Sequence, residues 1–150
     1  MARTTTALRL LLPAFLLGAI IAISFLEAPL KFLAPGVTIP IGLGIGRLVF
    51  TALNVLAGVV LIVLTVVSLR ARAGRATLGI LGAIWLVYVV EVAVIRPVLN
   101  QRSDLVIAGL AAAGTNWAHY AYIVADVTLV GLLIVLIVVT VRKVLPRDGR

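Results

Sequence analysis

Four long apolar stretches, rich in Val, Leu, Ile and Ala, restrict this chain to a small number of folds. Each stretch is at least about 20 residues long, the length that a helix needs to cross the hydrocarbon core of a bilayer. Hydrophobic residues make up 63% of the 150 residues, and the mean hydropathy is +1.27. A soluble domain could not cover that much apolar surface. The sequence therefore predicts an all-α integral membrane protein, a four-helix transmembrane bundle.

The predicted helices form one domain over residues 1–150. They span residues of about 7–30, 42–69, 76–98 and 116–144. The first apolar run, Ala7 to Leu26, is too long for an ordinary signal peptide, and no small-x-small cleavage site follows it. We therefore interpret it as a retained first helix. We expect Arg96-Pro97 to end the third helix, because proline disfavours a helical conformation in the residue before it.

The connecting segments carry local signals of their own. Pro35-Gly36 predicts a turn after the first helix. Ser103 is a suitable N-cap for a short helix through Ala113, which would lie at the membrane interface or dip back into the protein. Thr115 can cap the fourth helix.

Gly42 and Gly46, at the start of the second helix, form a small-xxx-small pair. Such a pair lets another helix approach closely. Glycines at a helix entry are also ordinary loop residues, and the sequence leaves both interpretations open.

The basic residues divide unevenly along the chain. Nine of the thirteen Lys and Arg lie at the N-terminus, in the turn after the second helix or at the C-terminus: Arg3, Arg9, Arg70, Arg72, Arg75, Arg142, Lys143, Arg147 and Arg150. Cytoplasmic segments of membrane proteins carry the excess of Lys and Arg. We therefore expect cytoplasmic N- and C-termini and location in the inner (plasma) membrane. The bilayer is the expected partner, with a homo-oligomer or a larger membrane complex as a further possibility.

The charges expected on the outer side cancel. They are four bases and four acids: Lys31, Arg47, Arg96, Arg102, Glu27, Glu91, Asp104 and Asp126. An unpaired charge at the centre of a membrane costs roughly 2.5–3.5 kcal/mol on insertion scales. We therefore expect Glu27 and Glu91 to lie within ion-pair distance of Lys31, Arg47 or Arg96.

Polar side chains in this outer half are the candidates for binding an ion or a small solute. They are Glu27, Lys31, Arg47, Asn54, Glu91, Arg96, His119, Tyr122 and Asp126. His119, Tyr122 and Asp126 share one face of the fourth helix at i, i+3 and i+7, which suits proton or cation transfer. The alternative is structural: the acids only lock helices together, and His119 is a hydrogen-bonded structural residue.

Several function classes lack their signals in this sequence. The chain has no cysteine, and its single histidine cannot complete a haem or zinc site by itself. The segment GLGIG lacks the strand and spacing of a nucleotide-binding motif. The basic segments have no aromatic interleaving that would predict a nucleic-acid partner. No cofactor, metal site or catalytic residue is predicted.

Four short motifs carry a resemblance to a known family. They are Pro29-x-x-Phe32, Gly46-Arg47-x-x-Phe50, Pro97 to Arg102, and His119-x-x-Tyr122. In these the chain resembles small four-helix bacterial membrane proteins of unknown function, which are similar in turn to a eukaryotic transmembrane protein associated with cisplatin resistance. Topology and the basic turn after the second helix are also similar to DoxX-like four-helix proteins. The resemblance implies a four-helix architecture and no particular activity.

Three functions are compatible with this pattern. The first hypothesis is a small transporter or channel-like protein that moves an ion or small solute through the outer polar cluster. The second is a non-catalytic accessory or assembly subunit of a larger membrane complex. The third is a membrane enzyme acting on a lipid or quinone, with the carboxylates and His119 in acid–base roles.

Overall fold

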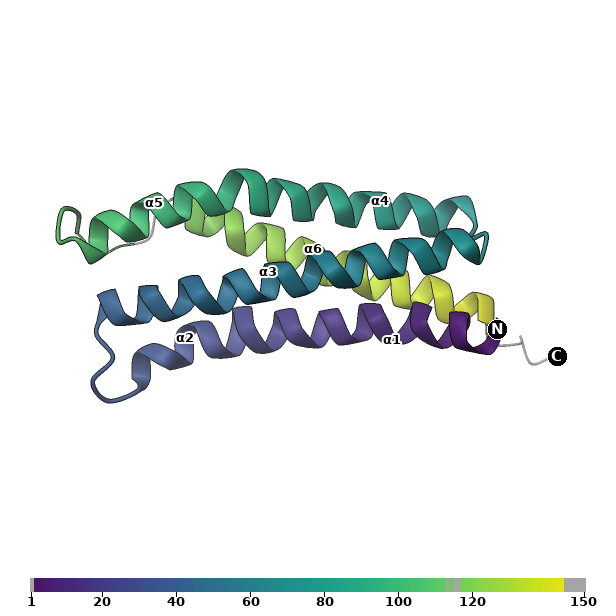
Figure 1. The fold of residues 1–150 in the computed structure, drawn as a ribbon, viewed down its shortest axis with the longest axis horizontal. Helices are drawn as coiled ribbons and strands as arrows, with labels where there is room; N and C mark the ends of the chain where they lie inside the picture. Colours follow the sequence, from purple (N-terminus) through teal and green to yellow (C-terminus); the bar gives the residue numbers. More distant parts are fainter. Residues whose placement is uncertain (1, 113, 115–116, 145–150) are drawn as a thin grey trace.

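Four helical runs, packed side by side and alternating in direction, make up the protein (Figure 1). The structure, a computed structural model, describes residues 2–112, 114 and 117–144. Among these residues there is no strand, and four runs are long and apolar enough to cross a membrane. They are Arg3–Leu33, Ile39–Arg70, Arg75–Ile107 and Trp117–Lys143. The prediction of an all-α, multi-pass membrane protein with a four-helix bundle is confirmed.

The first run is not a uniform α-helix. It comprises α1 (Ala2–Ile20), a π-helix η1 (Ile21–Glu27), α2 (Ala28–Leu30) and a 3₁₀ turn η2 (Lys31–Leu33). Figure 1 shows α2 and the loop after it bending away from the other helices.

The predicted turn at Pro35-Gly36 is confirmed, and Gly36 has a φ of 82°, which favours glycine. Helix α3 (Ile39–Arg70) follows, with the Thr38 hydroxyl accepting the Ile41 N–H at 3.5 Å as an N-cap. The helix starts earlier than the predicted residue 42 because Pro40 occupies its first turn, where a missing N–H costs nothing.

The third run continues past the proline expected to end it. It comprises α4 (Arg75–Val90), a π-helix η3 (Glu91–Ile95) and α5 (Arg96–Ile107). The predicted end at Arg96-Pro97 is therefore wrong. Ser103 lies inside α5 instead of capping a separate helix, and residues 108–111 form turns and bends.

Both π-helices end two residues before a proline, and this explains how the runs continue. Ala28 N–H, before Pro29, bonds to the Ile23 carbonyl, and Arg96 N–H, before Pro97, bonds to the Glu91 carbonyl. In an α-helix the proline ring would clash with the carbonyl four residues earlier. The wider π turn accommodates the ring without breaking the run.

The fourth run is α6 (Trp117–Val144), and the expected cap at Thr115 lies outside the described residues. The half of the bundle nearer the termini is filled by side chains from all four runs. The most deeply buried are Leu16, Leu61, Leu64, Ile84, Leu133 and Leu136. This half is a continuous apolar core.

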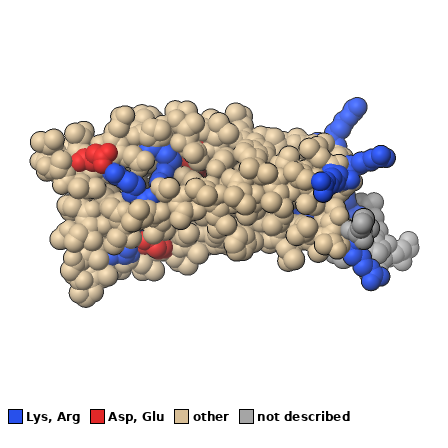
Figure 2. Space-filling view, viewed as in Figure 1, with Lys and Arg blue, Asp and Glu red and all other residues tan. Residues whose placement is uncertain are grey.

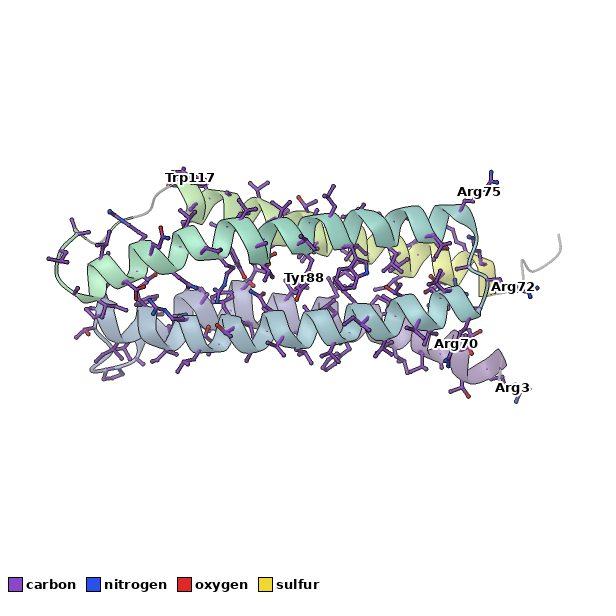
Figure 3. All side chains as sticks on the ribbon, turned by 45° about the horizontal axis from the view of Figure 1, so that its top comes forward. Arg3, Arg70, Arg72, Arg75, Tyr88 and Trp117 are labelled. Atoms are coloured by element: carbon purple, nitrogen blue, oxygen red, sulfur yellow. The ribbon has the colours of Figure 1, made fainter. Side chains whose placement is uncertain are left out.

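Tyr88 fastens α4 to α3 between the two halves of the bundle (Figure 3). Its hydroxyl donates to the Asn54 carbonyl at 2.9 Å. A Cβ at Gly58 would lie 2.6 Å from that hydroxyl oxygen, so the glycine makes room for the contact. One turn of α4 nearer the termini, Trp85 Nε1 donates to the Thr65 hydroxyl at 2.9 Å.

The two ends of the bundle differ in charge. The termini end holds Ala2, Val144 and the Arg70–Arg75 turn, and the loop end holds residues 34–38 and 108–112 (Figure 1). In Figure 2, Lys and Arg side chains project from the termini end, whereas basic and acidic atoms lie next to one another in the other half. The described basic residues are thus segregated as the sequence indicates.

Candidate functional site

A cavity of about 530 Å³ lies in the loop half of the bundle, between the first run, α3, α5 and α6. Its polar lining comprises Ser24, Lys31, Arg47, Arg96, Asn100, Ser103, His119, Tyr122 and Asp126. Its apolar lining includes Phe25, Ala28, Pro29, Phe32, Leu43, Phe50, Leu99 and Ile123. The volume is within the range of roughly 300–1,000 Å³ typical of small-molecule sites.

The first run changes its packing partners along its length beside this cavity. Helix α1 packs along both α6 and α3, whereas its continuation through η1 and η2 packs on α3. Phe25 on η1 and Ile123 on α6 both line the cavity, and both are 41% exposed. Because these helices span the membrane, the cavity has apolar walls that reach the lipid-facing surface.

Two glycines of α3 seat side chains of the first run. A Cβ at Gly42 would overlap the Phe32 ring, and a Cβ at Gly46 would lie 2.9 Å from Lys31 Nζ. The Gly42/Gly46 pair therefore does permit close approach, but it admits two side chains instead of a helix backbone. Its effect is to hold the Lys31 ammonium beside the cavity.

Lys31 and Arg96 share one aromatic ring. Lys31 Nζ and Arg96 Cζ each lie 5.5 Å from the centroid of Phe50, within the range of cation–π attraction. Phe50 in turn meets the edge of Tyr122, with centroids 5.4 Å apart. Lys31 also pairs with Glu27 at 3.3 Å, one turn earlier in the chain.

Arg96 is the most deeply buried cation of the cavity, with only 8% of its surface exposed. It donates through Nη2 to the Arg47 carbonyl at 3.4 Å and to the Thr51 hydroxyl at 3.3 Å. Its guanidinium lies 6.0 Å from the Tyr122 ring centroid. No carboxylate within the described chain lies within 4.0 Å of its nitrogens.

Two buried carboxylates, Glu91 and Asp126, lie around Arg96 without an ion pair to it. They are 2% and 3% exposed, and Arg96 is an electrostatic neighbour of both. Tyr122 lies beside Glu91, and Ser24 lies beside Asp126. The Ser24 and Tyr122 hydroxyls and Glu91 Oε2 are nevertheless buried without a protein partner at ordinary hydrogen-bond geometry. Ionisable residues inside a membrane-spanning bundle, such as these two carboxylates, often mark a functional interior.

A further ion pair lies at the loop end of the cavity. Arg47 on α3 pairs with Asp104 on α5 and donates to the Asn100 carbonyl at 3.4 Å. This pair is largely accessible, with the Asp104 side chain 61% exposed. It joins two walls of the cavity near its rim.

Most of the residues singled out from the sequence meet at this cavity. Lys31, Arg47, Arg96, His119, Tyr122 and Asp126 line it, so the predicted face of α6 is confirmed as a shared one. Glu27, Glu91 and Asn54 are not among its lining residues.

The pairing prediction is confirmed for Glu27 and wrong for Glu91. Glu27 pairs with Lys31, but Glu91 has no Lys or Arg nitrogen within 4.0 Å in the described part of the chain. Arg47 pairs with the exposed Asp104 instead. Helix α5 continues along α3 and so places the Asp104 carboxylate next to the Arg47 guanidinium.

Sequence reasoning missed Ser24 and Phe50 as parts of the site. Ser24 is a single hydroxyl in an apolar run, three residues before Glu27, and that isolation was its only signal. Phe50 could be found only from its neighbours, because an aromatic residue in a membrane helix is ordinary. Among the described residues no three His, Asp or Glu side chains gather in a way that could hold a metal ion.

Fold and site together define a class: a multi-pass, four-helix membrane protein with a cavity lined by polar and apolar side chains in one half of the bundle. Comparisons with protein-family models, with curated proteins and with solved structures find no match to this chain.

Proposed function

We propose that this protein is a small solute carrier whose binding site is the loop-half cavity, with the loop end facing outside and the termini in the cytoplasm. The observation that carries the proposal is the cavity itself, which places charged and aromatic side chains from four helical runs around one space. Ionisable residues inside a membrane are costly and usually mark a substrate or ion pathway. The chain forms this cavity without a second copy.

The packing of the other half favours a carrier over an open channel. Leu61, Leu64, Ile84 and Leu133 are each 1% exposed or less, and they close the bundle between the cavity and the termini end. A solute in the cavity would therefore reach the other side only after a conformational change. In this proposal the carrier alternates between two states, and the loop-half cavity is the solute site of the outward-facing state.

A cavity-filling substitution tests the proposal. Leu43 and Leu48 both lie on α3, but Leu43 lines the cavity whereas Leu48 is 74% exposed on the surface of the helix. Flux of protons, K⁺, chloride, benzoate and choline would be measured in vesicles that contain wild-type protein, Leu43→Trp or Leu48→Trp. We expect wild-type flux of at least one probe, its loss in Leu43→Trp and its retention in Leu48→Trp.

Two results would contradict the carrier. Equal flux in Leu43→Trp and wild type would show that the solute does not pass through the cavity. Wild-type rates no higher than those of protein-free vesicles for every probe would favour an accessory subunit, in which the buried charges only hold the helices together.

A further inference from the structure

The cavity combines a buried arginine and a largely buried lysine side chain with apolar walls, and this combination indicates the class of its ligand. We propose that it binds a single-chain amphipathic anion, whose head group lies between Arg96 and Lys31 and whose apolar tail extends past Phe25 and Ile123 toward the lipid. The inference rests on the proposed function in taking the cavity as the solute site, and it adds the chemistry of the solute.

The head-group position follows from Arg96 and Lys31. Arg96 is 92% buried (8% exposed), and the side chain of Lys31 is 10% exposed. Each lies 5.5 Å from the Phe50 centroid, and both line the cavity. Arg96 has no carboxylate within 4.0 Å in the described chain, so its guanidinium is available to a carboxylate or phosphate oxygen.

The balance of charge on the cavity surface also favours an anion. Lys31, Arg47 and Arg96 line the cavity, against a single carboxylate, Asp126. The other acids nearby do not line the cavity. Glu27 pairs with Lys31, and Asp104 pairs with Arg47. Glu91 is buried but is not a lining residue. A ligand in the cavity therefore meets mainly positive groups.

The apolar walls distinguish an amphiphile from a small inorganic anion. Phosphate or chloride would fill only the polar part, leaving a wall of Phe25, Leu43, Leu99 and Ile123 without a ligand contact. Phe25 and Ile123 are each 41% exposed, on helices that cross the membrane. An acyl or aryl tail could therefore pass between η1 and α6 while the head group stays at the bases.

Binding of a fluorescent fatty acid tests the proposal. Dansyl-labelled undecanoate would be titrated into the protein in phosphatidylcholine nanodiscs, with empty nanodiscs as the blank. We expect saturable binding that decanoate displaces, and binding of the methyl ester of the same probe at least about tenfold weaker, because the ester lacks the charged oxygens that Arg96 and Lys31 recognise.

Matched variants locate the head group. Lys31→Gln and the charge-balanced double variant Arg96→Gln/Glu91→Gln should each weaken binding by about tenfold or more. Arg102→Gln is the control, because Arg102 bonds to the Ala112 carbonyl outside the cavity lining, and it should bind as the wild type does. The double variant removes one positive and one negative charge together and so leaves the net charge of the buried cluster unchanged.

Four results would overturn the proposal. They are absence of saturable binding, equal affinity for acid and ester, stronger displacement by decyltrimethylammonium than by decanoate, and displacement by inorganic phosphate at the same concentration as by decanoate. The binding assay is independent of flux. Saturable undecanoate binding without vesicle flux would contradict the proposed carrier function and support the proposed ligand class. Flux that Leu43→Trp blocks, without undecanoate binding to the wild type, would support the carrier and contradict the proposed ligand class.

Discussion

Arg47 on α3 forms an ion pair with Asp104 on α5, 57 positions later in the chain. The pair joins two walls of the cavity at its loop end. It exists because the third run continues as a helix beyond Pro97, carrying Asp104 along α3. The deeper Glu91 and Asp126 lie around Arg96, which is an electrostatic neighbour of both.

Double-mutant cycles should distinguish the accessible Arg47–Asp104 pair from the buried Glu91, which does not pair with Arg47. Arg47→Met and Asp104→Asn should be coupled by no more than about 1 kcal/mol, because the pair is largely accessible. Arg47→Met and Glu91→Gln should have additive effects on stability, because these residues do not pair. Thermal unfolding in detergent measures both cycles. Coupling between Arg47 and Glu91 as large as that between Arg47 and Asp104 would contradict the arrangement.

The Arg96 cluster should respond asymmetrically to substitution. Arg96→Gln leaves two buried carboxylates without their cation and should cost about 3–5 kcal/mol. Glu91→Gln leaves Arg96 with the other carboxylate, Asp126, and should cost much less. Unfolding of the two variants in the same detergent gives the comparison. Equal losses would show that Glu91 and Asp126 do not share Arg96.

Because the Tyr88 hydroxyl lies against Gly58, we predict that position 58 does not tolerate a methyl group. Gly58→Ala would place a Cβ 2.6 Å from the Tyr88 hydroxyl oxygen and should cost about 1–3 kcal/mol of stability through overpacking. Gly82→Ala on α4 is the matched control, since no atom lies within 4 Å of its added Cβ. Its effect should be neutral or slightly stabilising, because alanine is the better helix former. A Gly58→Ala protein as stable as Gly82→Ala would rule out the close approach.

The charged turn between α3 and α4 predicts the orientation of the protein in the membrane. Arg70, Arg72 and Arg75 lie at the same end of the bundle as Arg3 (Figure 3). By the positive-inside rule a reporter fused after residue 150 should report a cytoplasmic location, and one inserted at Gly109 should report the outside. A cytoplasmic signal from Gly109 would place the cavity on the inner face.

The sequence by itself determined that this protein lies in a lipid bilayer, how many helices cross that bilayer, and how its charges are segregated along the chain. These follow from local quantities: the length of each apolar stretch and the position of each charge along it. The face of α6 that carries His119, Tyr122 and Asp126 was also predictable, because helical spacing alone places them together.

Only the tertiary structure decided which charges meet and that a cavity exists. The π turns before Pro29 and Pro97 let their runs continue, and the continued α5 brings Asp104 to Arg47, a pairing that no local spacing encodes. The cavity is lined by residues of four helical runs, and the positions of its cations depend on Gly46 and Phe50 of α3. Such contacts join residues far apart in the chain, so they are set by packing and not by local composition.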